Sequence, residues 1–238
     1  MPKHDAIPHE DWIEARKKLL RTEKEFTRLR DELSRERRSL PWEPVGKEYV
    51  FEGPDGKESL AEIFDGRSQL IVYHFMFDPE DDWDEACKSC SFWADNFNPI
   101  IVHLNARDVT MVAISRAQPE KIARYRERMG WTFKWLSSFG SDFNYDFAVS
   151  FRPEDFESPV YNFGTIAPGR ADREGMSVFF KDESGVIFRT YSSYARGIDL
   201  FNTAYNYLDV VPKGRGEDGQ FPQYWVRRHD EYRASAPA

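Results

Sequence analysis

The sequence predicts an α/β fold in which helices cover a central mixed β-sheet and a long helical arm precedes it. Two observations carry this prediction. After position 40, short apolar segments alternate with amphipathic ones, and a hairpin signal follows them. Residues 9–40, in contrast, contain neither glycine nor proline. Parallel strands need crossover helices whereas a hairpin adds an antiparallel pair, so one mixed sheet accommodates both halves of the body.

Residues 8–39 are expected to form one long helix. Pro8 suits the first helical position, where a missing N–H costs nothing. The apolar residues follow in alternating steps of three and four and form a single seam, which comprises Trp12, Ala15, Leu19, Thr22, Phe26, Leu29 and Leu33. At 1.5 Å per residue, a helix of about 30 residues spans roughly 45 Å. The seam must therefore lie across the body of the protein or against a second chain.

Charge favours the second arrangement for this arm. Residues 8–39 hold ten basic and eight acidic side chains, a net charge of +2, which leaves −10 on residues 40–238. A slightly basic arm on an acidic body would help two copies to exchange arms, although a solvated face explains the charges equally well. We therefore expect a homodimer formed through the N-terminal helix.

The first half of the body predicts a strand, a helix and a second strand. Lys47–Phe51 alternates between polar and apolar residues, and Gly53–Gly56 is a turn signal. Leu70–Phe77 is almost continuously apolar, as expected of a central strand that is covered on both faces. The acidic loop 78–86 then leads into a helix from about Cys87 to His103, and a buried strand follows at 109–115.

The second half predicts helices around a hairpin. Pro119 opens a helix that Gly130 ends. The turn residues 182–185 join two apolar segments into a hairpin. The remaining elements are a short helix at 141–149, an irregular stretch at 150–174, the hairpin strands 176–180 and 186–191, a helix at 197–208 and a polar, loop-like tail from 213. The whole order is that of a thioredoxin-like three-layer sandwich, and it divides the chain into an N-terminal helical arm (1–40), a thioredoxin-like domain (41–212) and a C-terminal extension (213–238).

Composition narrows the class of protein. The 238 residues include 33 basic and 41 acidic ones, a net charge of −8, which argues against a nucleic-acid partner. The start of the chain has no apolar core of a signal peptide, and the longest apolar segments are too short to cross a bilayer, so we expect a cytoplasmic protein without a membrane partner. Aromatic residues make up 16% of the chain, which implies a heavily packed core, an aromatic groove, or both.

Cys87-Lys-Ser-Cys90 carries the clearest chemical signal, because it follows a predicted buried strand and opens a predicted helix. The spacing puts both sulfurs on one helical face within reach of a disulfide bond. Free N–H groups at the start of a helix lower the pKa of a thiol. Cys87 is thus the expected nucleophile, and Cys90, one turn deeper, is the thiol that would resolve a mixed disulfide.

Several features oppose this interpretation. Six carboxylates lie within the nine residues before Cys87 and would disfavour a thiolate if they faced it. Two inert buried thiols, or half of a zinc site completed by His74 or His103, are the other interpretations. Structural zinc usually takes two close ligand pairs, and the sequence has no second pair, so we expect no metal. Trp83 and Trp93 most simply belong to the core, and they are also the candidates for an apolar substrate rim.

Four stretches of the sequence resemble a known family. Residues 73–98, 103–117, 128–147 and 190–209 resemble the bacterial domain-of-unknown-function 899 family, whose members are described as dithiol–disulfide oxidoreductases. The likeness extends from about residue 10 to 232. It implies a thioredoxin-like fold near the peroxiredoxin branch and an oxidoreductase activity through the cysteine pair.

Two positions depart from better understood relatives of that fold. Peroxiredoxins carry a threonine three positions before the peroxide-attacking cysteine, where this chain has Asp84, and thioredoxins carry a cis-proline before the strand that faces the active site. Here that strand, Ser177–Phe180, follows Gly175-Met176, and the chain has no proline between Pro168 and Pro212. Arg170, Arg173 and Arg196 are candidates for a cation near the sulfurs, although nothing in the sequence places them there.

The sequence therefore predicts thiol–disulfide exchange through the cysteine pair. The expected partners are a disulfide-containing protein or small thiol substrate and a cellular thiol reductant, and no bound cofactor is required. A non-catalytic binding protein on the same fold is the alternative that the acidic loop favours. A thiol peroxidase or peroxide sensor is a third, and it would form sulfenic acid at Cys87.

Overall fold

The computed structural model describes residues 5–232 of the chain. Contacts divide the chain into two compact units, Met1–Pro41 and Trp42–Ala238, so the first unit ends one residue beyond the predicted arm. The ends of the predicted arm and extension, 1–4 and 233–238, lie outside the described residues. The division by contacts does not separate residues 213–232 from the body.

The first unit contains the helix α1 (His9–Arg38), which is 30 residues long, as the seam predicted. Acidic residues occupy its first turn and basic residues its last, which stabilises both ends of the helix dipole. Ion pairs such as Arg16–Glu23, at 2.8 Å, line its polar surface. None of its residues is buried, and a single helix cannot cover its own apolar seam.

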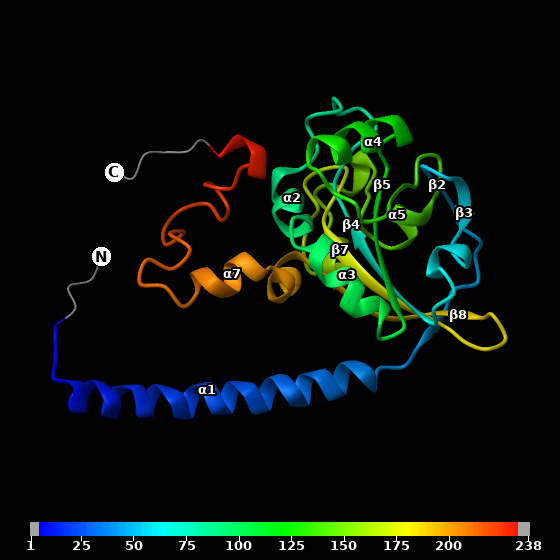
Figure 1. The fold of residues 1–238 in the computed structure, drawn as a ribbon. Coiled ribbons are helices and arrows are strands. Elements are labelled where there is room, and N and C mark those ends of the chain that lie inside the picture. The colour runs from blue at the N-terminus through cyan, green and yellow to red at the C-terminus, as the bar shows by residue number, and fades with distance from the viewer. Residues whose placement is uncertain (1–4, 233–238) are drawn as a thin grey trace. The chain divides into compact units, whose positions relative to one another are not determined.

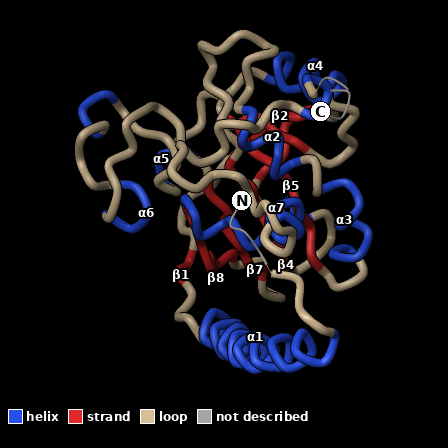
Figure 2. The backbone as a smooth tube through the Cα atoms, turned by 90° about the vertical axis from the view of Figure 1, so that its left-hand side faces the viewer, coloured by secondary structure: helices blue, strands red, loops and turns tan. Residues whose placement is uncertain are grey.

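The second unit is built on a mixed sheet of eight strands (Figure 1). Their order across the sheet is β1-β8-β7-β4-β5-β6-β2-β3. In chain order the strands are β1 (Glu43–Pro44), β2 (Val50–Gly53), β3 (Gly56–Ser59), β4 (Gln69–His74), β5 (Val109–Ser115), β6 (Trp135–Ser137), β7 (Gly175–Lys181) and β8 (Ile187–Tyr194). Figure 2 shows β1, β8, β7 and β4 side by side.

The four middle strands give the thioredoxin-like topology. β4 pairs in parallel with β5 across the crossover, as the alternation of strands and helices predicted. β7 pairs antiparallel with both β4 and β8, so the predicted hairpin adds its first strand to the far side of β4. The register places Gly175 opposite His74, and the residues just before β7 therefore lie beside the end of β4.

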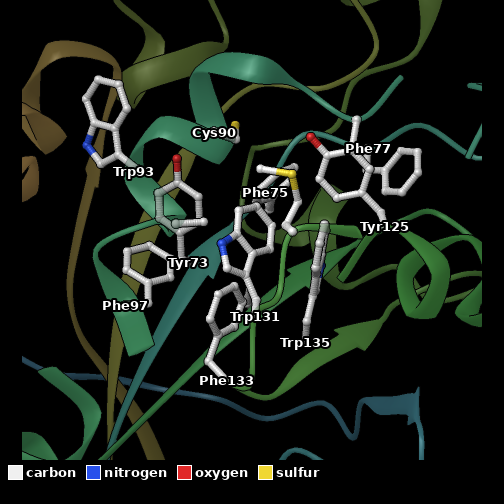
Figure 3. Packing of buried hydrophobic residues seen from close by; sticks show 14 of the residues in the cluster. Tyr73, Phe75, Phe77, Cys90, Trp93, Phe97, Tyr125, Trp131, Phe133 and Trp135 are labelled. Carbon is white, nitrogen blue, oxygen red and sulfur yellow. The ribbon is translucent and has the colours of Figure 1, made fainter. Parts of the chain in front are cut away.

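Helices and loops cover both faces of the sheet and complete three layers. The side chains of Tyr73, Met111 and Ala113 face the helices α2, α3 and α4, in a cluster dominated by aromatic rings (Figure 3). The alternate residues Leu70 and Val72 face the opposite cluster, which includes aromatic residues of the β2 and α5 segments. The high aromatic content thus mainly forms core. The helices of this unit are α2 (Lys88–Ala94), α3 (Phe97–Asn105), α4 (Pro119–Arg128), α5 (Phe143–Asp146), α6 (Tyr161–Gly164), α7 (Thr203–Leu208) and the short 3₁₀ helices η1 (Glu62–Phe64), η2 (Pro153–Asp155), η3 (Ala195–Phe201) and η4 (His229–Glu231).

Two predicted helices are each divided in the structure. The helix expected from Cys87 to His103 breaks between α2 and α3, because a continuous helix would bring the ring of Pro99 against the carbonyl of Asp95. The helix expected at 197–208 consists of η3 and α7. There Asn202 leaves the helical conformation and its side chain caps α7 by accepting a hydrogen bond from the Tyr205 N–H at 3.0 Å.

Other boundaries also shift. The ladder of the strand expected at 70–77 ends at His74, and the short strands β1 and β6 had no signal in the sequence. A strand of two or three residues is too short to show alternation, so only its neighbours in the sheet define it. Across residues 5–232, the structure contains no helix that is both long and apolar enough to cross a membrane.

Candidate active site

Both cysteines are held by one residue beyond the end of β4. The N–H of Met76 donates to Sγ of Cys90 at 3.5 Å, and its carbonyl accepts from the N–H of Cys87 at 3.3 Å. The loop of residues 77–86 therefore leaves the sheet and returns to the same point before α2 begins. This clamp places the sulfurs at the carboxyl end of a central strand.

Cys87 occupies the cap position of α2. Its Sγ accepts a hydrogen bond from the Cys90 N–H at 3.4 Å, so the sulfur takes the role that a serine oxygen has at other helix starts. Cys87 is half-buried and Cys90 is only 2% exposed, and both are free thiols. The more exposed sulfur thus belongs to the predicted nucleophile and the covered one to the predicted resolving thiol.

Hydrogen bonds and burial shift the pKa values of the two thiols in opposite directions. The Cys90 side chain, which donates to Sγ of Cys87, lowers the pKa of Cys87 to about 7, and the N–H groups of Cys90 and Ser89 add to this effect against burial and the charge of Glu174. Burial raises the pKa of Cys90, and negative charge on Cys87 and Glu174 raises it further. These shifts favour the thiolate form of Cys87 and the protonated form of Cys90.

The acidic loop does not surround the sulfurs. Asp78 forms an ion pair with Arg116, and Asp81 accepts a hydrogen bond from the Asp78 N–H at 3.1 Å. Asp81, Asp84 and Glu85 line a different pocket. None of the six carboxylates of the loop lines the pocket that contains the cysteines, so Asp84 does not face Cys87.

A pocket of about 260 Å³ opens over the two cysteines. Tyr73 and Trp93 contribute aromatic surface to it, and the sticks in Figure 3 show the Tyr73 hydroxyl pointing towards the helix that carries Cys90. Trp93 is fixed because its Nε1–H donates to the carbonyl of Ile198 at 3.0 Å. Residues 221–223 of the predicted C-terminal extension form another part of the wall.

The pocket also brings together charged residues that the sequence could not place. Arg170, Arg173 and Arg196 all line it. So does Glu174, which precedes β7 and therefore lies beside the end of β4. Asp199 completes the group. The position of Glu174 could have been predicted from the sequence. A hairpin strand that pairs antiparallel with β4 must start near the residues that follow β4, and Glu174 directly precedes that strand.

Comparison with known proteins now identifies the family. The family model described as "Bacterial protein of unknown function (DUF899)" matches residues 1–232. The chain belongs to this family. Among curated proteins, no significant match exists for this DUF899 protein.

Several solved structures are similar to this DUF899 protein. A cysteine-to-serine mutant of PrxQ from Xylella fastidiosa is 11% identical, with a TM-score of 0.43 over 67% of this chain and 89% of that one. The peroxidoxin BcpB of Mycobacterium tuberculosis is 13% identical, with a TM-score of 0.46 over the same shares. The mitochondrial 2-Cys peroxiredoxin of Plasmodium falciparum is 12% identical, with a TM-score of 0.44 over 77% and 99%.

The other sequence candidates of this DUF899 protein lie away from the sulfurs. Trp83 lines the second pocket, where Arg124 stacks 4.2 Å above its ring, so it is not part of the cysteine site. His74 is a core residue: its Nε2 lies 2.9 Å from Oγ of Ser177, and burial lowers its pKa to about 3. Within residues 5–232, no group of three or more His, Cys, Asp or Glu side chains forms a potential metal site.

The start of β7 also differs from the thioredoxin arrangement. No cis peptide bond occurs among residues 5–232. Gly175 begins the strand, and a Cβ at this position would lie 2.7 Å from Cδ1 of Tyr194. The neighbouring ring therefore requires glycine here, and no proline stands at the start of β7.

Proposed function

We propose that this protein carries out thiol–disulfide exchange through Cys87 and Cys90. The single observation that supports this most strongly is the asymmetry of the pair. The half-buried Cys87 has its pKa lowered by hydrogen bonds, whereas the covered Cys90 has its pKa raised by burial. Attack by one thiol and later release by the other need this difference.

The reaction has two steps. The thiolate of Cys87 attacks one sulfur of a substrate disulfide, the substrate S–S bond breaks, and the leaving thiolate takes a proton from solvent. Cys90 then loses its proton and attacks Sγ of Cys87. This closes the intramolecular disulfide and releases the second substrate thiol. The protein loses two electrons and the substrate gains them, so a cellular thiol must reduce the bridge before the next cycle.

A matched pair of variants tests the proposal. The protein should accelerate the reduction of insulin disulfides by dithiothreitol, and this acceleration should require both cysteines. Cys87→Ser should abolish the acceleration, whereas Cys90→Ser should accumulate a mixed disulfide at Cys87 that intact-mass spectrometry detects. Because the two variants make the same atomic change three residues apart, a general loss of folding would not produce opposite trapping results. Full activity in both variants would overturn the proposal.

The two alternative functions, a non-catalytic binding protein and a thiol peroxidase, predict different outcomes for the same wild-type protein. A binding protein that does not use its thiols would keep both cysteines reduced in a glutathione redox buffer and would trap nothing. A thiol peroxidase would instead form sulfenic acid at Cys87 within seconds of exposure to hydrogen peroxide. The partly exposed Cys87 permits either reaction, but the position of Cys90, one turn away, favours exchange.

A further inference from the structure

The pocket over the cysteines has a basic side, which we call the arginine wall: Arg170, Arg173 and Arg196. Three arginines around one small pocket contrast with the net charge of −8 on the whole chain. Two carboxylates, Glu174 and Asp199, also line the pocket. Whether the wall can bind an anion depends on how many of its guanidinium groups these carboxylates already occupy.

The carboxylates leave part of the wall unoccupied. Nε of Arg173 lies 3.8 Å from Oε2 of Glu174, which is too long for a hydrogen bond, and this buried Nε–H has no other acceptor among the described residues. Oδ2 of Asp199 lies 3.3 Å from Nε of Arg196 and also 3.3 Å from Nη1 of Arg215. Arg215 does not line the pocket, so Asp199 divides its charge between the arginine wall and a residue outside it.

Arg170 is the freest member of the wall. Its side chain is exposed, and it forms no hydrogen bond or ion pair within the part of the chain that the structure describes. A guanidinium group offers five N–H donors in a fork that matches a carboxylate. The pocket thus presents an unused anion-binding group on the same surface as Sγ of Cys87.

We propose that the substrate is a small disulfide that carries a carboxylate, which Arg170 and Arg173 bind while Cys87 attacks the S–S bond. This inference rests on the proposed exchange function and names its substrate class. The dimensions agree with a small molecule, because a pocket of about 260 Å³ admits a narrow group to a half-buried sulfur more readily than the surface of a folded protein. Phe221 and Pro222 supply apolar wall for the methylene groups between the carboxylate and the sulfur.

Three disulfides of similar size test the inference: 3,3′-dithiodipropionate, which carries two carboxylates, the neutral bis(2-hydroxyethyl) disulfide, and the cationic cystamine. Each is mixed in excess with the fully reduced protein. The rate of closure of the Cys87–Cys90 bridge is then measured by acid quench, alkylation and mass spectrometry. The wild-type protein should react with the dianion about fivefold faster than with the neutral disulfide, as expected for an exposed ion pair, and slowest with cystamine.

Variants of Arg170 show whether the preference for the dianion depends on the charge of this side chain or on its size. Arg170→Gln should reduce the ratio of dianion to neutral rates to near one, Arg170→Lys should retain most of it, and Arg170→Glu should reverse the order in favour of cystamine. Arg107→Gln is the matched control, because Arg107 is also exposed but lies in the α3–β5 connection, at the end of β5 away from the sulfurs. It should leave the ratio unchanged.

The outcomes distinguish this inference from the function on which it rests. If all three disulfides close the bridge at equal rates, exchange stands and the anionic substrate class is wrong. If Arg170→Gln keeps the wild-type ratio, the arginine wall is not the binding site. If no disulfide closes the bridge, the proposed function itself fails.

Discussion

Replacing Cys90 with alanine should raise the pKa of Cys87. The Cys90 side chain is the largest influence that holds this pKa at about 7, compared with an ordinary value of 9.0. Two pKa units correspond to about 2.7 kcal/mol of preference for the thiolate. The N–H groups of residues 89 and 90 remain in the variant, so we expect the pKa to rise by about one unit rather than two.

The assay is the rate of iodoacetamide alkylation at Cys87 as a function of pH, quantified by peptide mass spectrometry on the reduced protein. Cys90→Ser keeps an O–H donor and should shift the midpoint less than Cys90→Ala does. Ser89→Ala is the control, because Ser89 acts on Cys87 through its backbone N–H and the substitution preserves that group. A wild-type midpoint near 9, or the same midpoint in Cys90→Ala, would refute this account of the thiolate.

Three further predictions concern redox poise, stability and assembly. The cysteine pair should have a reduction potential between about −270 and −120 mV in a thiol buffer series, and a value below about −300 mV would indicate a structural bridge instead. Arg116→Met removes the cation 2.8 Å from the buried Asp172 carboxylate and leaves it only the Ser150 hydroxyl, so it should lower the free energy of unfolding in urea by about 3 kcal/mol. Lys47→Met, which breaks exposed ion pairs, should change it little. Light scattering should find a homodimer that Phe26→Asp on the apolar seam of α1 dissociates, whereas Arg28→Gln, an equal charge change on the opposite face, should not. A monomeric wild type would end the dimer hypothesis.

The sequence predicted the central strands well because their signals are local. Val109–Ser115 is apolar at five of its seven positions, and the structure has a strand over the same seven residues. The turn at residues 182–185 likewise defined the hairpin of β7 and β8. Helix boundaries were less predictable, since a break such as the one before Pro99 depends on whether the chain can satisfy its backbone in another way.

The candidate site was predictable only in part. The spacing of Cys87 and Cys90 predicted directly that the two sulfurs are close, because a step of three residues is about one helical turn. The charged residues around the sulfurs could not be predicted from spacing. None of the six acidic residues close in sequence lines the pocket, while Glu174 and Arg170, 80 or more positions away, do. Contacts of that kind follow from strand pairing and loop paths, which no local pattern encodes.

The tail after α7 has a consequence for how this protein could be dissected or altered. Val226 is fully buried, and the Arg228 guanidinium donates to the carbonyl of Ala86, the residue before Cys87, at 2.9 Å. A fragment that ends at residue 212 would therefore keep every strand of the sheet yet lose residues that border the sulfurs. Conversely, changes in residues 221–223 reshape the mouth of the pocket without touching a strand. The sheet and the mouth of the pocket are thus formed by different stretches of chain, so residues 221–223 can be changed while every strand is kept.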